Sequence, residues 1–271
     1  VQPEASYQFD EELKGPVAVD GNPKVPANPQ NPVAMAERAR PWLAAAKDRP
    51  FFLYFCATIP HRMGKGFGNE KTFPGTKPVV FDPKDIVVPP WLPDAEAVRA
   101  DLADYDQAVS RFDDGVGRLV RVLRETGHWD DTLLIVLSDN GPPFPGAKTT
   151  LYEPGVRLPL LVHAPGQTPE AATTDAMVTW ADITPTILDF AGVATSGLKL
   201  QGRSFLKAMN DPHPQGWDTI YLSHTFHEVT MYYPMRAIRT RRYKLILNLA
   251  WPLEYPFASD LYGSPTWQWV L

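Results

Sequence analysis

Residues 133–148 read LLIVLSDNGPPFPGAK, an apolar run that ends abruptly in Ser-Asp-Asn-Gly. The apolar part, Leu133–Leu137, is typical of a strand that is buried on both faces. The carboxylate of Asp139 and the amide of Asn140 follow directly where this strand ends. In open α/β sheets, ligands bind beyond the carboxyl ends of the strands. The stretch therefore predicts both a core strand and one edge of a binding site.

Strand and helix patterns alternate on both sides of this stretch. Phe51–Ala57 and Leu158–His163 are further apolar runs that predict buried strands. From Val98 to Leu123, apolar residues recur at spacings of four and three, which predicts a long amphipathic helix. Shorter helices are expected at Ala34–Lys47 and Asp182–Ala191. This order favours an α/β fold, with a mainly parallel sheet and helices on both of its faces.

The pattern changes after residue 203. The stretches TIYLSH, MRAIRT and YKLILN predict strands of a smaller, more antiparallel region. We therefore expect an α/β domain over residues 1–203 and the start of a smaller α+β region over residues 204–271. Many of the 29 prolines gather in three stretches between the predicted elements, where long loops of the kind that carry functional residues are expected.

Composition excludes several classes of function. The net charge of −5 predicts no basic surface for nucleic acid. No apolar run reaches the roughly 18 residues of a membrane-spanning helix, so we expect no membrane partner. The single cysteine, Cys56, stands inside an apolar run and is expected to be a small core residue.

Asp139, Asn140 and Lys148 are the first candidates for chemistry. A carboxylate and an amide carbonyl are the oxygen ligands that Ca²⁺ and Mg²⁺ prefer, although Asp-Asn-Gly also fits a simple turn. A lysine beside a cation site can hold an anionic oxygen, but Lys148 taken alone would be a solvated surface residue. Glu153 and Arg157, which follow it, could pair with each other and shape the loop.

Two further polar stretches follow predicted strands. His61 and Arg62 come soon after the run at residues 51–57, where a histidine can act as an acid or contact an anion, or be an ordinary surface residue. His227 and Glu228 lie in SHTFHEVTMYYPMR, residues 223–236. A metal site there lacks a third ligand at usable spacing, so a polar loop that recognises substrate fits better.

Taken together, these motifs resemble the sulfatase family of the alkaline-phosphatase-like superfamily. SDNG, KTTLYEPGVRLP at residues 148–159, Pro60-His61 and DITPTILDFAG at residues 182–192 occur in the order of that family. The resemblance covers nearly the whole chain and implies an alkaline-phosphatase-like α/β fold. It also implies that Asp139 and Asn140 hold Ca²⁺, and that Lys148 and His61 hold the sulfate group as catalytic residues.

Within the family, the chain is most similar to the sulfamidases, which are N-sulfoglucosamine sulfohydrolases that act on heparan. The segments FDPKDIVVPPWLPD, SDNGPPFP, HEVTMYYPMR and SPTW carry this likeness. It implies a sulfated sugar as substrate, with Arg62, His227 and Glu228 as substrate-binding residues. Two departures bear on substrate choice: sulfamidases have Asp where this chain has Ile59, and Arg where it has Lys148.

Other motifs of the family have no counterpart in this sequence. Sulfatases carry an Asp-Asp metal pair, a Cys-x-Pro-Ser-Arg motif whose cysteine becomes the formylglycine nucleophile, and a Lys-x-His segment. We expect these, and a further C-terminal stretch, to lie outside this chain, and we expect a fragment that does not turn over by itself. The family suggests a lysosomal, periplasmic or secreted location, and a homodimer is one oligomeric state that the resemblance allows.

Three alternative functions are compared with this interpretation. The first is an arylsulfatase-like enzyme that cleaves O-sulfate esters. The second is a phosphodiesterase or phosphatase of the same superfamily, whose zinc sites need additional histidine ligands that this chain lacks. The third is a non-catalytic sugar-binding module.

Overall fold

The computed structural model describes residues 9–167, 171–228 and 231–271. They form two compact units: unit 1 contains the residues up to Trp129 together with Ser264–Leu271, and unit 2 contains Asp130–Gly263. Ser264–Leu271 join unit 1 because the final helix packs on a helix of that unit, and the domain boundary expected at residue 203 stays a prediction. No helix in the described part of the chain is both long enough and apolar enough to cross a membrane.

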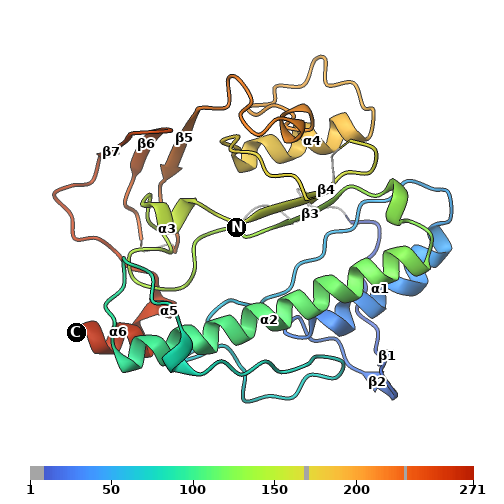
Figure 1. Cartoon of the computed structure of the whole chain (residues 1–271), viewed down its shortest axis with the longest axis horizontal. Coiled ribbons are helices and arrows are strands. Elements are labelled where there is room, and N and C mark those ends of the chain that lie inside the picture. Colours follow the sequence, from blue (N-terminus) through green and yellow to red (C-terminus); the bar gives the residue numbers. More distant parts are fainter. Residues whose placement is uncertain (1–8, 168–170, 229–230) are drawn as a thin grey trace. The chain divides into compact units, whose positions relative to one another are not determined.

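Two helices lie side by side in unit 1 (Figure 1). Helix α1 spans Pro32–Ala46 and helix α2 spans Glu96–Glu125, which confirms the long helix predicted from apolar spacing. α1 begins where the side chain of Asn31 accepts a hydrogen bond from the Ala34 N–H at 3.0 Å. It continues through Pro41, although a proline inside a helix removes a backbone hydrogen bond.

Ion pairs join the two helices of unit 1. Arg118 of α2 lies 2.8 Å from Glu37 of α1, and Arg40 of α1 lies 2.5 Å from Glu125 of α2. The other elements are smaller: strands β1 (Val17–Val19) and β2 (Asn22–Val25), the 3-10 helix η2 (Pro83–Asp85), and helix α6 (Pro265–Val270). The 3-10 helix η3 (Trp129–Asp131) stands where the chain passes from unit 1 to unit 2.

The strand predicted at residues 51–57 is wrong. These residues pair with no strand among the described residues, and their side chains alternate between exposed and half-buried. Phe52 is 62% exposed and Tyr54 is 66% exposed, and Cys56 is also exposed rather than part of the core. A strand is buried on both faces only when it has neighbours in a sheet and a layer on each side. Here the ring of Phe51 instead contacts a tryptophan and a histidine of unit 1.

Unit 2 opens with the strand quoted first. β3 (Leu134–Leu137) pairs with β4 (Leu160–His163), with Leu134 opposite His163. This pairing is antiparallel, so the expected parallel pairing is wrong for these two strands, and every strand pair among the described residues is antiparallel. Residues 138–159, which include helix α3 (Glu153–Val156), connect the two strands. Next come η4 (Trp180–Asp182), α4 (Ile183–Phe190) and η5 (Lys207–Asn210).

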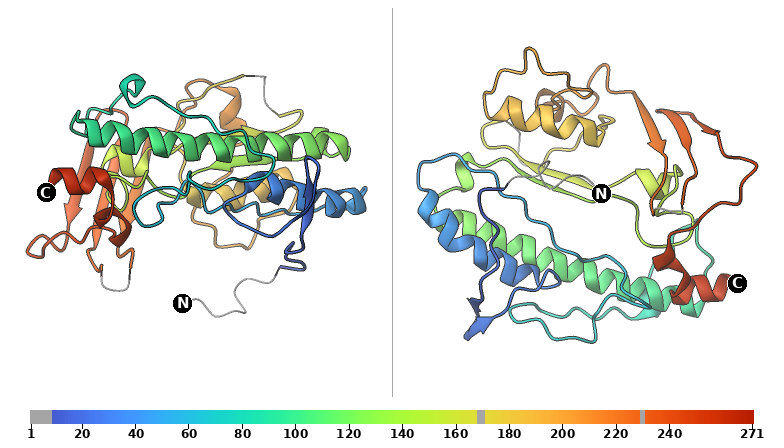
Figure 2. Two further views of the ribbon diagram at one scale, coloured as in Figure 1. Left: turned by 90° about the horizontal axis from the view of Figure 1, so that it is seen from below. Right: turned by 180° about the vertical axis from the view of Figure 1, so that it is seen from behind.

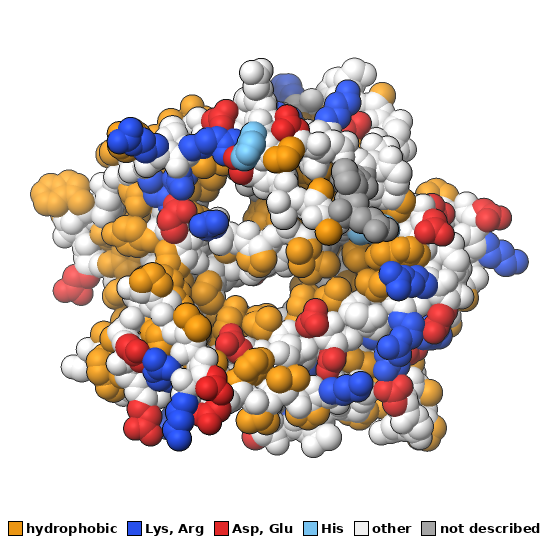
Figure 3. Space-filling view, viewed as in Figure 1, with side chains coloured by type: hydrophobic (Ala, Val, Ile, Leu, Met, Phe, Trp, Pro, Cys, Tyr) orange, Lys and Arg blue, Asp and Glu red, His pale blue; other side chains and the backbone are white. Residues whose placement is uncertain are grey.

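The three strands predicted after residue 203 are confirmed. β5 (Thr219–His224), β6 (Met235–Thr240) and β7 (Lys244–Asn248) form one antiparallel sheet, seen as a single layer in Figure 2. One face of the sheet buries Met235 together with Leu151 from the loop between β3 and β4. The other face is open, and hydrophobic side chains are visible at the surface around this sheet in Figure 3. A short helix, α5 (Ser259–Tyr262), follows.

Candidate active site

Lys148 is buried, with 4% of its surface exposed, so it is not the solvated residue that its position alone would suggest. It stands in the loop between β3 and β4, where its backbone N–H donates to the carbonyl of Pro142 at 3.2 Å. Its ammonium Nζ donates to Oδ2 of Asp260 at 2.6 Å. Thr149, the next residue, has a φ of +68°, a conformation that non-glycine residues rarely adopt. The turn therefore directs the lysine inward, against a carboxylate from a distant part of unit 2.

Two glycines bring the end of β3 against the loop that carries Lys148. A Cβ atom on Gly141 would stand 2.5 Å from the carbonyl oxygen of Pro154. A Cβ atom on Gly155 would stand 2.4 Å from the carbonyl oxygen of Ala147. Both distances are shorter than real contacts of Cβ atoms, so only glycine fits at either position. The spacing of the SDNG and KTTLYEPGVRLP motifs thus reflects close backbone packing between two parts of one loop.

Glu153 fastens this loop to the β5–β7 sheet. Its Oε1 accepts hydrogen bonds from Arg239 of β6 at 3.0 Å and from Lys244 of β7 at 2.6 Å. The alternative in which Glu153 pairs with Arg157 is wrong, because the sheet brings these two cations to the carboxylate. Partial burial opposes ionisation, but the bonds from Lys244 and Arg239 together lower the pKa of Glu153.

Asp139 and Asn140 lie at the carboxyl end of β3, as predicted. Asp139 is exposed and Asn140 is half-buried, and the hydroxyl of Ser138 donates to the Asn140 carbonyl at 2.7 Å. Their carboxylate and amide oxygens are hard donors, which fits Ca²⁺ chemistry. A Ca²⁺ ion takes about six to eight oxygens, so these residues can supply part of a shell. Within the described residues, no group of three or more His, Cys, Asp or Glu side chains could hold a metal.

His227 and Glu228 belong to the same neighbourhood of unit 2 as Lys148. Desolvation is the largest cause that lowers the pKa of His227, and the charge of Lys148 lowers it further. The carboxylates of Asp260 and Glu228 act in the opposite direction, while His224 adds to the lowering. We call these five residues, Lys148, His224, His227, Glu228 and Asp260, the polar cluster. It joins the loop after β3, the end of β5 and the start of α5.

Glu228 is held by Ser259, a residue that sequence reasoning did not single out. Its Oε1 accepts the backbone N–H of Ser259 at 3.0 Å and the Ser259 hydroxyl at 2.7 Å. The hydroxyl bond and the backbone bond lower the pKa of Glu228, so the group is an acceptor at neutral pH. Neither Ser259 nor Asp260 belongs to a motif, and only their contacts with predicted residues reveal them.

His61 and Arg62 belong to unit 1. His61 is exposed, and its backbone N–H donates to the Thr58 carbonyl at 2.9 Å. The side chain of Arg62, by contrast, is 0% exposed and donates to both oxygens of Asp101, at 2.8 and 3.1 Å. Its guanidinium also lies over the ring of Phe67, 4.5 Å from the centroid. The predicted direct contact of Arg62 with substrate stays a prediction, and this burial does not favour it.

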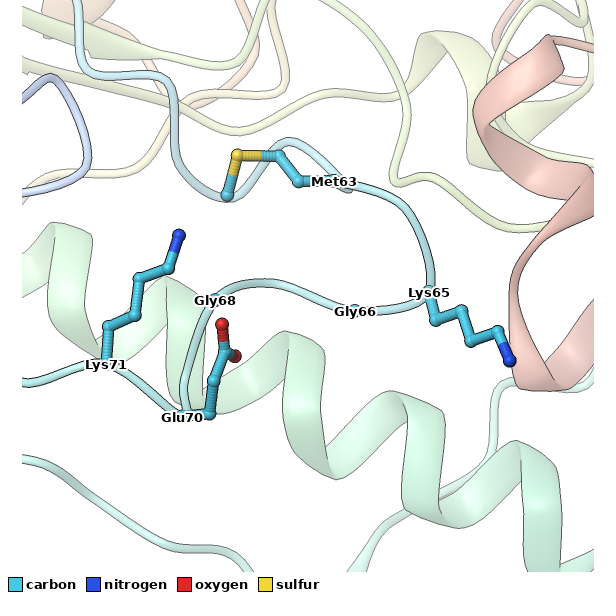
Figure 4. A pocket seen from close by; sticks show the side chains of 6 residues that line it. All are labelled: Met63, Lys65, Gly66, Gly68, Glu70 and Lys71. Carbon is cyan, nitrogen blue, oxygen red and sulfur yellow. The ribbon is translucent and has the colours of Figure 1, made fainter.

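A pocket of about 270 Å³ lies on the loop that follows Arg62. Figure 4 shows its lining side chains, among which Lys65 points away from Glu70 and Lys71. The predicted site residues are not among its lining residues, so the pocket does not define the site.

Comparison with known proteins gives a consistent result. The sulfatase family model matches residues 4–193, and the model of the N-sulphoglucosamine sulphohydrolase C-terminal region matches residues 147–258. Human N-sulphoglucosamine sulphohydrolase is 37% identical, in an alignment that covers 100% of this chain and 57% of the human protein. The chain therefore spans little more than half the length of this relative.

Solved structures agree on the fold. A 2-O GAG sulfatase matches with a TM-score of 0.60 and 18% identity, over 90% of this chain and 57% of that one. The phosphonate monoester hydrolase SpPMH from Silicibacter pomeroyi matches with a TM-score of 0.59 and 20% identity, over 91% of this chain and 59% of that one. At these identities the likeness shows the fold alone. Since the sulfatase model matches well over half of its residues, the chain belongs to the sulfatase family and has its alkaline-phosphatase-like α/β fold.

Proposed function

We propose that the whole protein containing this chain is a sulfohydrolase that removes the N-sulfate from glucosamine residues of heparan-type glycans. The polar cluster carries this proposal, because Lys148, expected to hold an anion, lies in it with His227 and Glu228, expected to hold a sugar. The human relative supports the same substrate class, since it is an N-sulphoglucosamine sulphohydrolase and the similarity runs along the entire chain.

Each residue has a separate task in this proposal. Lys148 presents its ammonium to the sulfonyl oxygens, on which negative charge develops as the S–N bond breaks. His61 donates a proton to the leaving amine. His227 and Glu228 exchange hydrogen bonds with sugar hydroxyls. Arg62, the next residue in the sequence, is held by Asp101 and so fixes the backbone that presents this histidine.

Asp139 and Asn140 are proposed as ligands of Ca²⁺, with the remaining oxygens coming from elsewhere in the whole protein. Sulfatases generally use Ca²⁺ and formylglycine: when bound, the ion supplies positive charge for the sulfonyl oxygens, and formylglycine supplies the nucleophile. Isothermal titration with Ca²⁺ tests the ligand assignment independently of activity. We expect Asp139→Ala to weaken Ca²⁺ binding by about tenfold or more, and unchanged affinity would refute Asp139 as a ligand.

Sulfate release by the whole protein tests the proposed reaction. We expect release from N-sulfoglucosamine and little from glucosamine 6-O-sulfate or an aryl sulfate. Activity confined to the O-sulfate esters would refute the proposed substrate, and binding of N-sulfated disaccharide without hydrolysis would indicate a sugar-binding module instead.

A lysine variant tests the proposed role of the polar cluster. Lys148→Met should lower kcat/KM by about a hundredfold, because it removes a charge that acts on the transition state. The exposed Lys199 offers a matched control, since Lys199→Met removes the same charge from the surface. Equal activity of the two variants would contradict the assignment of Lys148.

A further inference from the structure

Ser259 and Asp260 are consecutive residues that each contact a different member of the proposed site. Ser259 donates its N–H and its hydroxyl to Glu228, at 3.0 and 2.7 Å. Asp260 accepts the ammonium of Lys148 at 2.6 Å. One dipeptide thus contacts both the residue proposed for the sulfate and a residue proposed for the sugar. Lys148 and Asp260 are 112 positions apart in the sequence, so no local pattern produces this arrangement.

The backbone that carries this dipeptide is well anchored. Ala258 and Leu261, on either side of it, are both 0% exposed, and the Leu261 N–H donates to the Ala258 carbonyl at 3.0 Å. Two buried flanking residues leave little freedom for the two polar side chains between them. The dipeptide is therefore suited to hold other side chains at set positions.

The Lys148 ammonium and the Glu228 carboxylate can each form hydrogen bonds beyond those to the dipeptide. An ammonium has three N–H donors, and the bond to Asp260 uses one of them, so others can meet an anionic oxygen. Both bonds from Ser259 reach Oε1 of Glu228, so Oε2 can accept a donor such as a sugar hydroxyl. The side chain of Asp260 is 14% exposed and that of Lys148 is 4% exposed, so both members of this ion pair are largely shielded from solvent.

We propose that Ser259 and Asp260 are positioning residues that set the spacing between the sulfate-binding Lys148 and the sugar-binding Glu228. In this arrangement Asp260 orients the lysine and Ser259 orients the glutamate, so a ligand is recognised by the distance between its sulfate and its hydroxyls. This inference rests on the proposed function, because it assigns a supporting role to residues of the same site.

Kinetics of two single variants of the whole protein separate the two halves of the proposal. Asp260→Asn keeps the size of the side chain but removes its charge. We expect inorganic sulfate to inhibit this variant about tenfold more weakly than the wild type, and kcat/KM to fall about ten- to a hundredfold. Ser259→Ala should raise KM for N-sulfoglucosamine while inhibition by sulfate stays unchanged. Asp218→Asn, at an exposed carboxylate of unit 2, and Ser196→Ala, at an exposed serine of unit 2, are matched controls.

Histidine titration followed by NMR gives a readout that requires no turnover. The charge of Asp260 raises the pKa of His227, so Asp260→Asn should lower this pKa further, whereas Ser259→Ala should change it less. Asp260→Glu keeps the charge but displaces it. The pKa of His227 should therefore stay near its wild-type value, while inhibition by inorganic sulfate weakens. Unchanged titration and unchanged sulfate inhibition in Asp260→Asn would overturn the proposal.

The two proposals fail differently. If the wild-type protein releases no sulfate from N-sulfoglucosamine but binds inorganic sulfate through Lys148, the proposed function is wrong while the positioning role survives. If the wild type is active and both dipeptide variants behave like their controls, the positioning role is wrong while the proposed function survives.

Discussion

The buried pair of Arg62 and Asp101 allows a quantitative prediction about stability. The two side chains are 0% and 1% exposed, and Asp101 also accepts the backbone N–H and the hydroxyl of Thr266, at 3.2 and 2.7 Å. Asp101→Asn removes the negative charge that faces the buried guanidinium of Arg62. Removing one partner of such a pair costs about 3–5 kcal/mol of the free energy of unfolding. For a chain of this size, each kcal/mol lowers Tm by about 2–4 °C, so we expect a loss of about 6–20 °C.

Urea denaturation and thermal unfolding measure this effect, and hydrogen exchange shows whether the loss falls on unit 1. Asp94→Asn is the matched control, because Asp94 also pairs with an arginine, Arg99, but its side chain is 60% exposed. An exposed pair contributes about 0–1 kcal/mol, so the control should unfold close to the wild type. Replacing both buried partners by Arg62→Met with Asp101→Leu should cost less than Asp101→Asn alone. Equal stability of Asp101→Asn and Asp94→Asn would refute the reasoning.

Two further predictions concern the loop between β3 and β4. Gly155→Ala places a methyl group against backbone oxygens and should cost about 1–3 kcal/mol, whereas Gly117→Ala, in α2 with nothing within 4 Å, should be neutral or stabilising in the same urea assay. Because the pKa of Glu153 is lowered in the folded protein, its contribution is present above the ordinary carboxyl pKa and is lost as pH falls through the lowered value. Glu153→Gln should therefore destabilise at pH 7 by about 1 kcal/mol and hardly at pH 3; equal losses at both pH values in urea titrations would contradict this.

Elements with a strong local pattern could be predicted from the sequence. The apolar spacing of α2 and the short alternating strands β5–β7 predicted the observed helix and sheet. The run at residues 51–57 has the composition of a buried strand, but burial depends on neighbouring strands, which composition cannot report. The direction of β4 beside β3 likewise depends on how the connecting loop returns. Two glycines pack this loop against itself, and its acid, Glu153, binds partners that lie far along the chain.

The candidate site was predictable only where it carried motifs. The motifs placed Asp139 and Asn140 at the end of β3, whereas the proximity of Lys148 to His227 and Glu228 comes from the structure. Ser259 and Asp260 carry no motif, and side-chain contact alone identifies them. For Arg62 the motif was present but the surroundings could not be predicted. Its sequence neighbourhood suggested a contact with a ligand, whereas in the structure it is buried in an ion pair with a residue 39 positions away.

The contact between Asp101 and Thr266 also sets an order of events during synthesis. The two residues are 165 positions apart, and the whole of unit 2 is translated between them. At about 5–20 residues per second, the ribosome needs on the order of ten to thirty seconds to reach Thr266 after Asp101 has been made. During that interval Asp101 has not yet met Thr266 of α6, and the nascent unit 1 presents the surface of α2 that this helix later covers. A chaperone that binds this surface of α2 would therefore act on unit 1 while unit 2 is being made, and would leave when Ser264–Leu271 arrive.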